Sequence, residues 1–120
     1  MSIPASRVRI KRAYAAPAPE DGVRVLVDRL WPRGLARGKA SIDEWIKNVA
    51  PSTALRQWFG RDAAHWQGFR ERYLAELQQQ DFLIRHLRAL AREGPLTLLY
   101  AARDSAQNNA VVLRERILGR

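Results

Sequence analysis

Two short apolar runs, each ending abruptly in charged residues, constrain the fold of this chain more than any other feature. In residues 23–27 a valine occupies every second position, and β-branched residues at this spacing are typical of a β-strand. Leu26 makes the opposite face apolar as well, which is typical of a strand that is covered on both faces in a parallel sheet. Residues 96–101 form the most apolar run of the chain and therefore predict the central strand.

A third strand and several helices complete the predicted set of elements. Residues 7–12 alternate strictly between basic and apolar side chains, which predicts a half-exposed strand near an edge of the sheet. Elsewhere, apolar residues recur at helical spacing. The predicted helices are a short one over residues 42–49, one that Ser52 caps and Gly60 closes, one capped by Asp62, one from Asp81 to Gly94, and a last one capped by Asp104 or Ser105.

These elements predict a single α/β domain. Two of the strands are separated by helical segments, and a right-handed crossover connection would place those helices against the sheet. We therefore expect one compact three-layer domain over residues 7–120, with a small, largely parallel sheet flanked by helices. Residues 1–6 are expected to form a flexible N-terminal tail.

The chain is strongly basic, with a formal net charge of +9 from 21 basic and 12 acidic residues. A basic field favours anionic partners such as nucleic acid, phosphorylated metabolites or acidic proteins. Arginine outnumbers lysine 18 to 3, however, which is also typical of proteins from genomes rich in G and C. The charge is therefore open to two interpretations, a functional field and a merely solvated surface.

The residues that the chain lacks also limit its function. Without cysteine it has no disulfide, no thiolate nucleophile and no cysteine-ligated metal. The first residues lack the apolar segment of a signal peptide, and no stretch approaches the ~18 apolar residues of a membrane span. These features fit a cytoplasmic protein without a membrane partner.

Charged side chains follow both apolar strands. Asp28, Arg29 and Arg33 come after the first, and Arg103 and Asp104 come after the second. In open α/β sheets, ligands bind outside the carboxyl ends of parallel strands. The two charged strand ends therefore predict one site.

The chemistry of this predicted site depends on what the arginines pair with. Guanidinium groups offer planar, bidentate donors to phosphate or carboxylate. Alternatively, the arginines pair with Asp28 and Asp104 and only hold the loops together. The two aspartates are weaker candidates for acid–base catalysis or Mg²⁺ binding, because neighbouring arginines would lower their pKa values. Whether a reaction is catalysed stays open.

Two further side chains complete the candidate ligand-binding set. Asn108 lies one helical turn after Asp104 and can face the same crevice. Trp31 lies among arginines and can stack on a base, although packing beneath the loop is the commoner use of such a residue. The two histidines, His65 and His86, have no cysteine partners, so no metal site is predicted. No cofactor is evident, because the common nucleotide-binding motifs are absent.

Three blocks of sequence resemble a known family. They are residues 25–34 (VLVDRLWPRG), 50–59 (APSTALRQWF) and 98–104 (LLYAARD). Together they are similar to the YeaO-like family of small bacterial proteins, a domain of unknown function, over residues 7–117. The resemblance implies a compact α/β domain and brings no established activity with it. The family usually has Asn-His-Ala where this chain has Asn108-Asn109-Ala110, so a proton-transferring histidine at that position would be absent here.

Three functions fit these observations, in order of preference. The first is binding of a small anionic ligand, phosphate- or nucleotide-bearing, in a crevice at the carboxyl ends of the strands. The second is weak, non-specific binding of nucleic acid through the basic first third and Trp31, although no known nucleic-acid-binding motif is present. The third is a protein-interaction domain whose strand-end loops contact a partner. The oligomeric state stays open.

Overall fold

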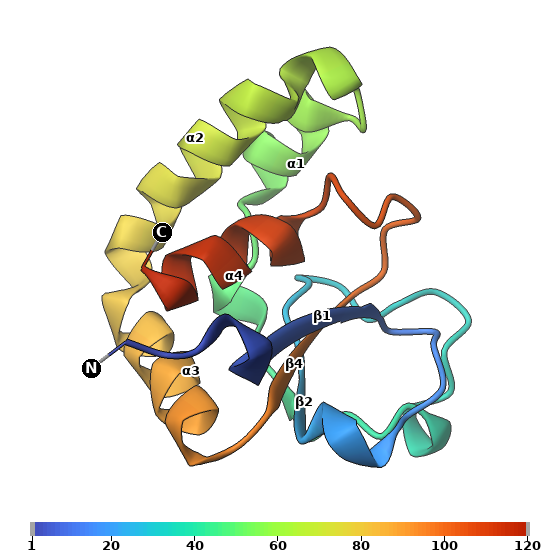
Figure 1. The fold of residues 1–120 in the computed structure, drawn as a ribbon. Coiled ribbons are helices and arrows are strands. Elements are labelled where there is room, and N and C mark those ends of the chain that lie inside the picture. The colour runs from blue at the N-terminus through green and yellow to red at the C-terminus, as the bar shows by residue number, and fades with distance from the viewer. Residues whose placement is uncertain (1, 120) are drawn as a thin grey trace.

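The computed structural model describes residues 2–119, which contain a four-stranded, all-parallel sheet (Figure 1). The strands are β1 (Val8–Arg12), β2 (Val23–Leu26), β3 (Glu44–Trp45) and β4 (Leu96–Tyr100). Their order across the sheet is β1-β4-β2-β3, and every pairing is parallel. All four carboxyl ends therefore lie at one edge, which we call the carboxyl edge.

β4 is the centre of the sheet, as its apolar composition predicts. All five of its residues are buried, and it pairs with β1 on one side and with β2 on the other. Leu96 stands opposite Val8 of β1 and Val23 of β2. This register brings the ends of β2 and β4 to the same level, so that the loops following these strands begin side by side.

The helices lie together on one face of the sheet (Figure 1). Tyr73, Leu87 and Leu113 come from different helices and pack with Val25 and Leu98 in the main core. The α-helices are α1 (Thr53–Phe59), α2 (Trp66–Leu77), α3 (Asp81–Glu93) and α4 (Asn109–Leu118). Short 3₁₀ turns occur at Ala5–Arg7, Pro19–Asp21, Arg37–Lys39, Lys47–Val49, Ala63–His65 and Gln78–Gln80.

Irregular segments cover the other face of the sheet. Leu26 and Leu99 form a small second core with Ala13, and the half-buried rings of Trp31 and Trp45 pack against it. The compact α/β domain with a parallel sheet is confirmed, and the layer on this second face consists of loops, whereas flanking helices were expected. Burial on both faces explains why residues 23–27 are apolar on both sides.

A buried ion pair holds the loop that precedes β2. The Asp21 carboxylate is almost fully buried, accepts hydrogen bonds from Lys11 Nζ and Arg24 Nη1, and lies 3.0 Å from Lys11 Nζ. Thr97 Oγ1 donates to the Asp21 carbonyl oxygen at 2.7 Å. These polar groups satisfy one another, so this cluster serves to fasten the loop to the sheet.

The helix predicted over residues 42–49 is wrong, because this segment contains the short strand β3 and the 3₁₀ turn Lys47–Val49 and no α-helix. Within it, Trp45 packs on the second core whereas Val49 lies in the main core, and a single helical face could not reach both. The Ile46 amide donates to the Leu26 carbonyl at 3.0 Å, so β3 pairs with the open edge of β2. Pairing with β2 satisfies backbone groups that a helix would leave unpaired at that edge.

The segment expected to form an N-terminal tail contacts the domain where the structure describes it. Ile3 is 7% exposed and belongs to the main core, and Arg114 Nη2 donates to the Ala5 carbonyl oxygen at 2.8 Å.

The helices within residues 2–119 are too short or too polar to cross a membrane.

Candidate functional site

Asp28 joins two of the loops that leave the carboxyl edge. It lies two residues beyond β2, and its Oδ2 accepts a hydrogen bond from the Ala101 amide, just beyond β4, at 2.9 Å. Its Oδ1 accepts one from Asn109 Nδ2 at 3.1 Å, and the same nitrogen lies 3.1 Å from the Val27 carbonyl oxygen. One carboxylate therefore fastens the end of β2 to the end of β4 and to the first turn of α4.

The surroundings of Asp28 raise the pKa of its carboxyl group. Burial raises the pKa of this carboxyl group, and this effect exceeds the opposing effects of the Asn109 and Ala101 hydrogen bonds and of the Arg56 charge. Arg56 lies on α1 and is exposed. The Arg56 charge thus acts on the same edge as the loops after β2 and β4.

Arg29 is bonded to the protein backbone. Its Nη2 donates to the Ala50 carbonyl oxygen at 3.2 Å and its Nε to that of Pro51 at 3.4 Å. The half-buried guanidinium therefore connects the loop after β2 to the segment that leads into α1. It positions that segment, and its two bonds leave only part of its donor capacity for a ligand.

Two titratable residues of α2, Tyr73 and Glu76, lie close to this edge and were not among the predicted site residues. The Tyr73 hydroxyl donates to the Val49 carbonyl oxygen at 2.6 Å, and full burial, together with the charges of Asp28 and Glu76, raises its pKa well above the ordinary value. The Glu76 carboxylate accepts hydrogen bonds from the Ser52 amide at 2.8 Å and from its hydroxyl at 2.6 Å. No local sequence signal reveals these contacts, because 24 positions separate the partners in each pair.

In the loop after β4, polar side chains accept hydrogen bonds from nearby backbone amides. Asp104 is exposed, and its Oδ1 accepts hydrogen bonds from the Ala106 and Gln107 amides, which lower the pKa of its carboxyl group. Asn108, which is buried, caps α4: its Oδ1 accepts from the Val111 amide at 3.1 Å. The prediction that Asp104 or Ser105 caps the last helix is therefore wrong. Asn108 is a better cap here because the chain needs four more residues to reach the start of the helix.

Two of the predicted site arginines are free. Arg33 and Arg103 are exposed, and neither guanidinium has a hydrogen-bonding or ion-pairing partner within residues 2–119. Their loops are both held at the carboxyl edge. Tyr14 donates its hydroxyl to the Arg33 carbonyl oxygen at 2.8 Å, and the Arg12 guanidinium donates to the carbonyl oxygens of Ala101 and Ala102.

Trp31 packs within its own loop. Its Nε1 donates to the Leu35 carbonyl oxygen at 2.7 Å, and its ring lies edge-on to Trp45 with 5.5 Å between centroids. The Arg37 guanidinium lies 4.4 Å from the centroid of the Trp31 ring. Trp45 Nε1 in turn donates to the Asp28 carbonyl oxygen at 2.8 Å, so the aromatic pair supports the backbone of the site.

Comparison with known proteins identifies the family. A family model described as "Inactive DUF488-N3 subclade" matches residues 7–120. The chain belongs to the DUF488 family. The resemblance to the YeaO-like proteins is thereby confirmed: the chain is 44% identical to the uncharacterised protein YeaO of Escherichia coli over 108 residues, which cover 90% of this chain and 94% of the relative. An uncharacterised protein of Mycobacterium tuberculosis strain H37Rv is 38% identical over 115 residues, covering 96% and 97%. No solved structure gives a significant match.

In this DUF488 protein some of the predicted site residues are bonded within the fold and others are exposed. Asp28 and Arg29 are bonded to neighbouring segments, and Asn108 is buried as a cap. The guanidinium groups of Arg33 and Arg103 have no hydrogen-bonding or ion-pairing partner among the residues that the structure describes. Within residues 2–119 no group of three His, Asp or Glu side chains is arranged to hold a metal ion. Asn109, at the position where the family usually has histidine, serves as a hydrogen-bond donor to Asp28.

Proposed function

We propose that this protein binds a small phosphate-bearing anion, either free phosphate or a nucleotide, at the carboxyl edge of its sheet. One observation carries the proposal: the Asp28 carboxylate bonds to the Ala101 amide, and so joins the loop that bears Arg33 to the loop that bears Arg103. Both guanidinium groups are exposed and unpaired within residues 2–119. Guanidinium groups that are already free of carboxylate partners are suited to bidentate binding of phosphate oxygens.

The charge balance of the edge supports an anion over a cation. Arg33 and Arg103 contribute two positive charges, and a third comes from Arg56, whose charge acts on Asp28. The acidic groups of this edge already have partners within the fold, because Asp28 accepts from the Ala101 amide and from Asn109, and Asp104 accepts from the Ala106 and Gln107 amides. The family description, an inactive subclade, favours binding without a chemical step.

The experiment compares phosphate binding by the wild-type protein and by Arg103→Ala. Each charge-assisted hydrogen bond is worth roughly 1.5–3 kcal/mol, and 1.4 kcal/mol corresponds to tenfold in affinity. We expect Arg103→Ala to weaken binding of inorganic phosphate or ATP at this edge by ~10-fold or more in calorimetric titrations. The melting temperature without ligand should stay unchanged, since an exposed, unpaired side chain contributes little packing.

A matched control is Arg61→Ala, which removes an exposed arginine from the turn after α1. It should leave phosphate affinity unchanged. The proposal is wrong if Arg103→Ala lowers the melting temperature strongly while its response to phosphate equals that of the wild type. That pattern would show that Arg103 holds a carboxylate of the protein.

Nucleic-acid binding is a second candidate, favoured by the net charge of +9 and by the exposure of the free arginines. Phosphates of a nucleic acid backbone satisfy the same guanidinium chemistry as a free nucleotide. Leu30, in the same loop as Arg33, is 63% exposed, and an exposed apolar side chain at this edge also suits a macromolecular partner. The salt dependence of binding separates these partners from a small anion.

A further inference from the structure

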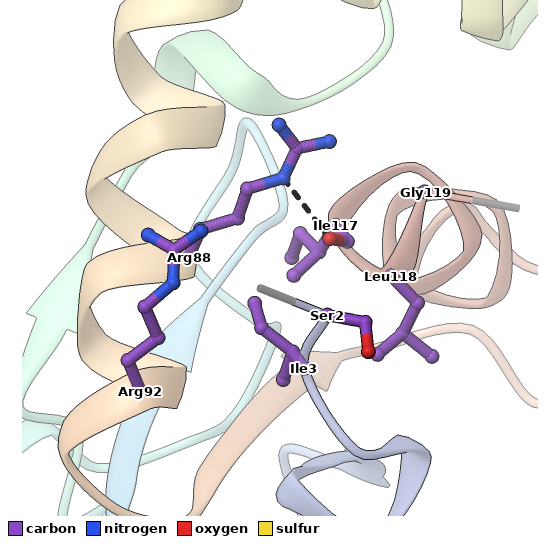
Figure 2. Close-up of a pocket in the computed structure, with 7 residues that line it drawn as sticks. All are labelled: Ser2, Ile3, Arg88, Arg92, Ile117, Leu118 and Gly119. Atoms are coloured by element: carbon purple, nitrogen blue, oxygen red, sulfur yellow. Dashed lines mark hydrogen bonds between the residues drawn. The ribbon is translucent and has the colours of Figure 1, made fainter.

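Two arginines of α3, Arg88 and Arg92, line a cavity at the opposite end of the molecule from the carboxyl edge (Figure 2). It has a volume of about 160 Å³ and lies between α3, the last turn of α4 and the segment that precedes β1. Its lining residues are Ser2, Ile3, Arg88, Arg92, Ile117, Leu118 and Gly119. Among these lining residues only Arg88 and Arg92 have charged side chains, and both are basic.

Arg88 is fixed in place by the end of α4. Its Nε donates to the Ile117 carbonyl oxygen at 3.0 Å, and its Nη2 donates to the Arg116 carbonyl oxygen at 2.9 Å. These bonds satisfy carbonyl groups that a helix leaves unpaired at its C-terminus. They leave Nη1 of Arg88 without a protein partner within residues 2–119. A guanidinium that is already ordered loses little freedom when it binds a ligand.

Positive charges crowd around this position. Arg92 lies one helical turn after Arg88 on α3, is exposed, and has no side-chain hydrogen bond within residues 2–119. Burial lowers the pKa of Arg88, and the charges of Arg116 and Arg92 lower it further, against a single opposing charge from Asp81. An anion in the cavity would relieve this repulsion between the arginines.

The remaining lining restricts what the anion can carry. Ser2 adds a hydroxyl group that can donate to or accept from an anionic oxygen. Ile3, Ile117 and Leu118 give the cavity an apolar floor. We propose that this cavity binds a phosphate group, as inorganic phosphate or as the phosphate of a small organic ester whose carbon atoms contact the apolar floor. The two neighbouring cations, Arg88 and Arg92, suit a phosphate dianion better than a singly charged carboxylate.

The test uses the full chain, labelled with ¹⁵N and titrated with inorganic phosphate at constant ionic strength, with chloride replaced by phosphate. We expect saturable shifts of the amide signals of Ile3, Leu118 and Gly119. Arg92→Ala should raise the dissociation constant obtained from these shifts at least tenfold. Arg61→Ala is the matched control, because Arg61 is exposed in the turn after α1, which contributes no residue to the lining of the cavity. It should leave the dissociation constant unchanged.

A second titration with glycerol 3-phosphate distinguishes the two sources of phosphate. Tighter binding than that of inorganic phosphate, with added shifts of the Ile117 and Leu118 methyl signals, would identify an ester. Equal affinity would identify free phosphate. The inference is overturned if the three amide signals do not shift saturably, or if Arg92→Ala and Arg61→Ala bind alike. Arg103→Ala should leave these shifts unchanged, so the outcome is independent of the carboxyl-edge proposal.

Discussion

Asp28 and Asp104 each accept two N–H hydrogen bonds, yet their surroundings move their pKa values in opposite directions. Burial raises the pKa of Asp28. Backbone hydrogen bonds to Ala106 and Gln107 lower that of the exposed Asp104. From the sequence alone, neighbouring arginines are expected to lower both pKa values. For Asp28 this expectation misses burial, which depends on contacts with Ala101 and Asn109 that lie more than seventy positions away.

This contrast predicts opposite effects of pH on stability. The folded state binds the Asp28 proton more tightly than the unfolded state does, so the Asp28 contribution is largest below about pH 3.9 and decreases as the pH rises through the raised pKa. The Asp104 contribution is present above that pH and is lost as the pH falls through the lowered pKa. Urea unfolding from pH 3 to 8 should therefore show that the stability advantage of wild type over Asp28→Asn shrinks with rising pH, whereas its advantage over Asp104→Asn grows. Parallel pH profiles of the two variants would contradict this assignment.

At the scale of elements, the spacing of apolar residues predicts a helix or strand correctly where all of these residues face the same core. The strand at residues 96–100 and the helix from Thr53 to Phe59, with its Ser52 cap and left-handed Gly60, form as the sequence predicts. Residues 42–49 do not, because their apolar side chains serve two separate cores and only resemble a helical stripe. The position of a strand edge that needs a partner cannot be read from local sequence.

The start of α4 gives a test at this scale. The Asn108 side chain accepts from the Val111 amide and donates to the Asp104 carbonyl oxygen, whereas the Ser105 side chain makes no hydrogen bond within residues 2–119. Loss of an N-cap side chain typically costs ~1 kcal/mol. Asn108→Ala should therefore lower the free energy of unfolding by about 1–2 kcal/mol, and Ser105→Ala should change it by less than about 0.5 kcal/mol. Equal losses in chemical denaturation would show that the helix is capped as its sequence suggests.

At the scale of the whole molecule, the parallel sheet separates two basic regions. The carboxyl edge carries Arg33 and Arg103 on loops, and the opposite end carries Arg88 and Arg92 on a helix. Sequence alone predicts the first region, since charge follows directly after two apolar strands. It gives no sign of the second, where the last turn of α4 and α3 meet only through tertiary contacts.

The response to salt decides which kind of anion the molecule as a whole binds. Affinity for duplex DNA falls with salt with a log–log slope near −0.9 for each phosphate contact. We expect only weak binding without sequence preference in fluorescence anisotropy with a labelled 20-base-pair duplex across a series of KCl concentrations. If the carboxyl edge supplies the contacts, the double variant Arg33→Ala, Arg103→Ala should reduce the magnitude of the slope by about 2, because each lost phosphate contact removes about one unit. Arg61→Ala, in the turn after α1, should reduce it by less than 1. Tight, sequence-selective binding at physiological salt would instead place nucleic acid ahead of a small anion as the partner of this protein.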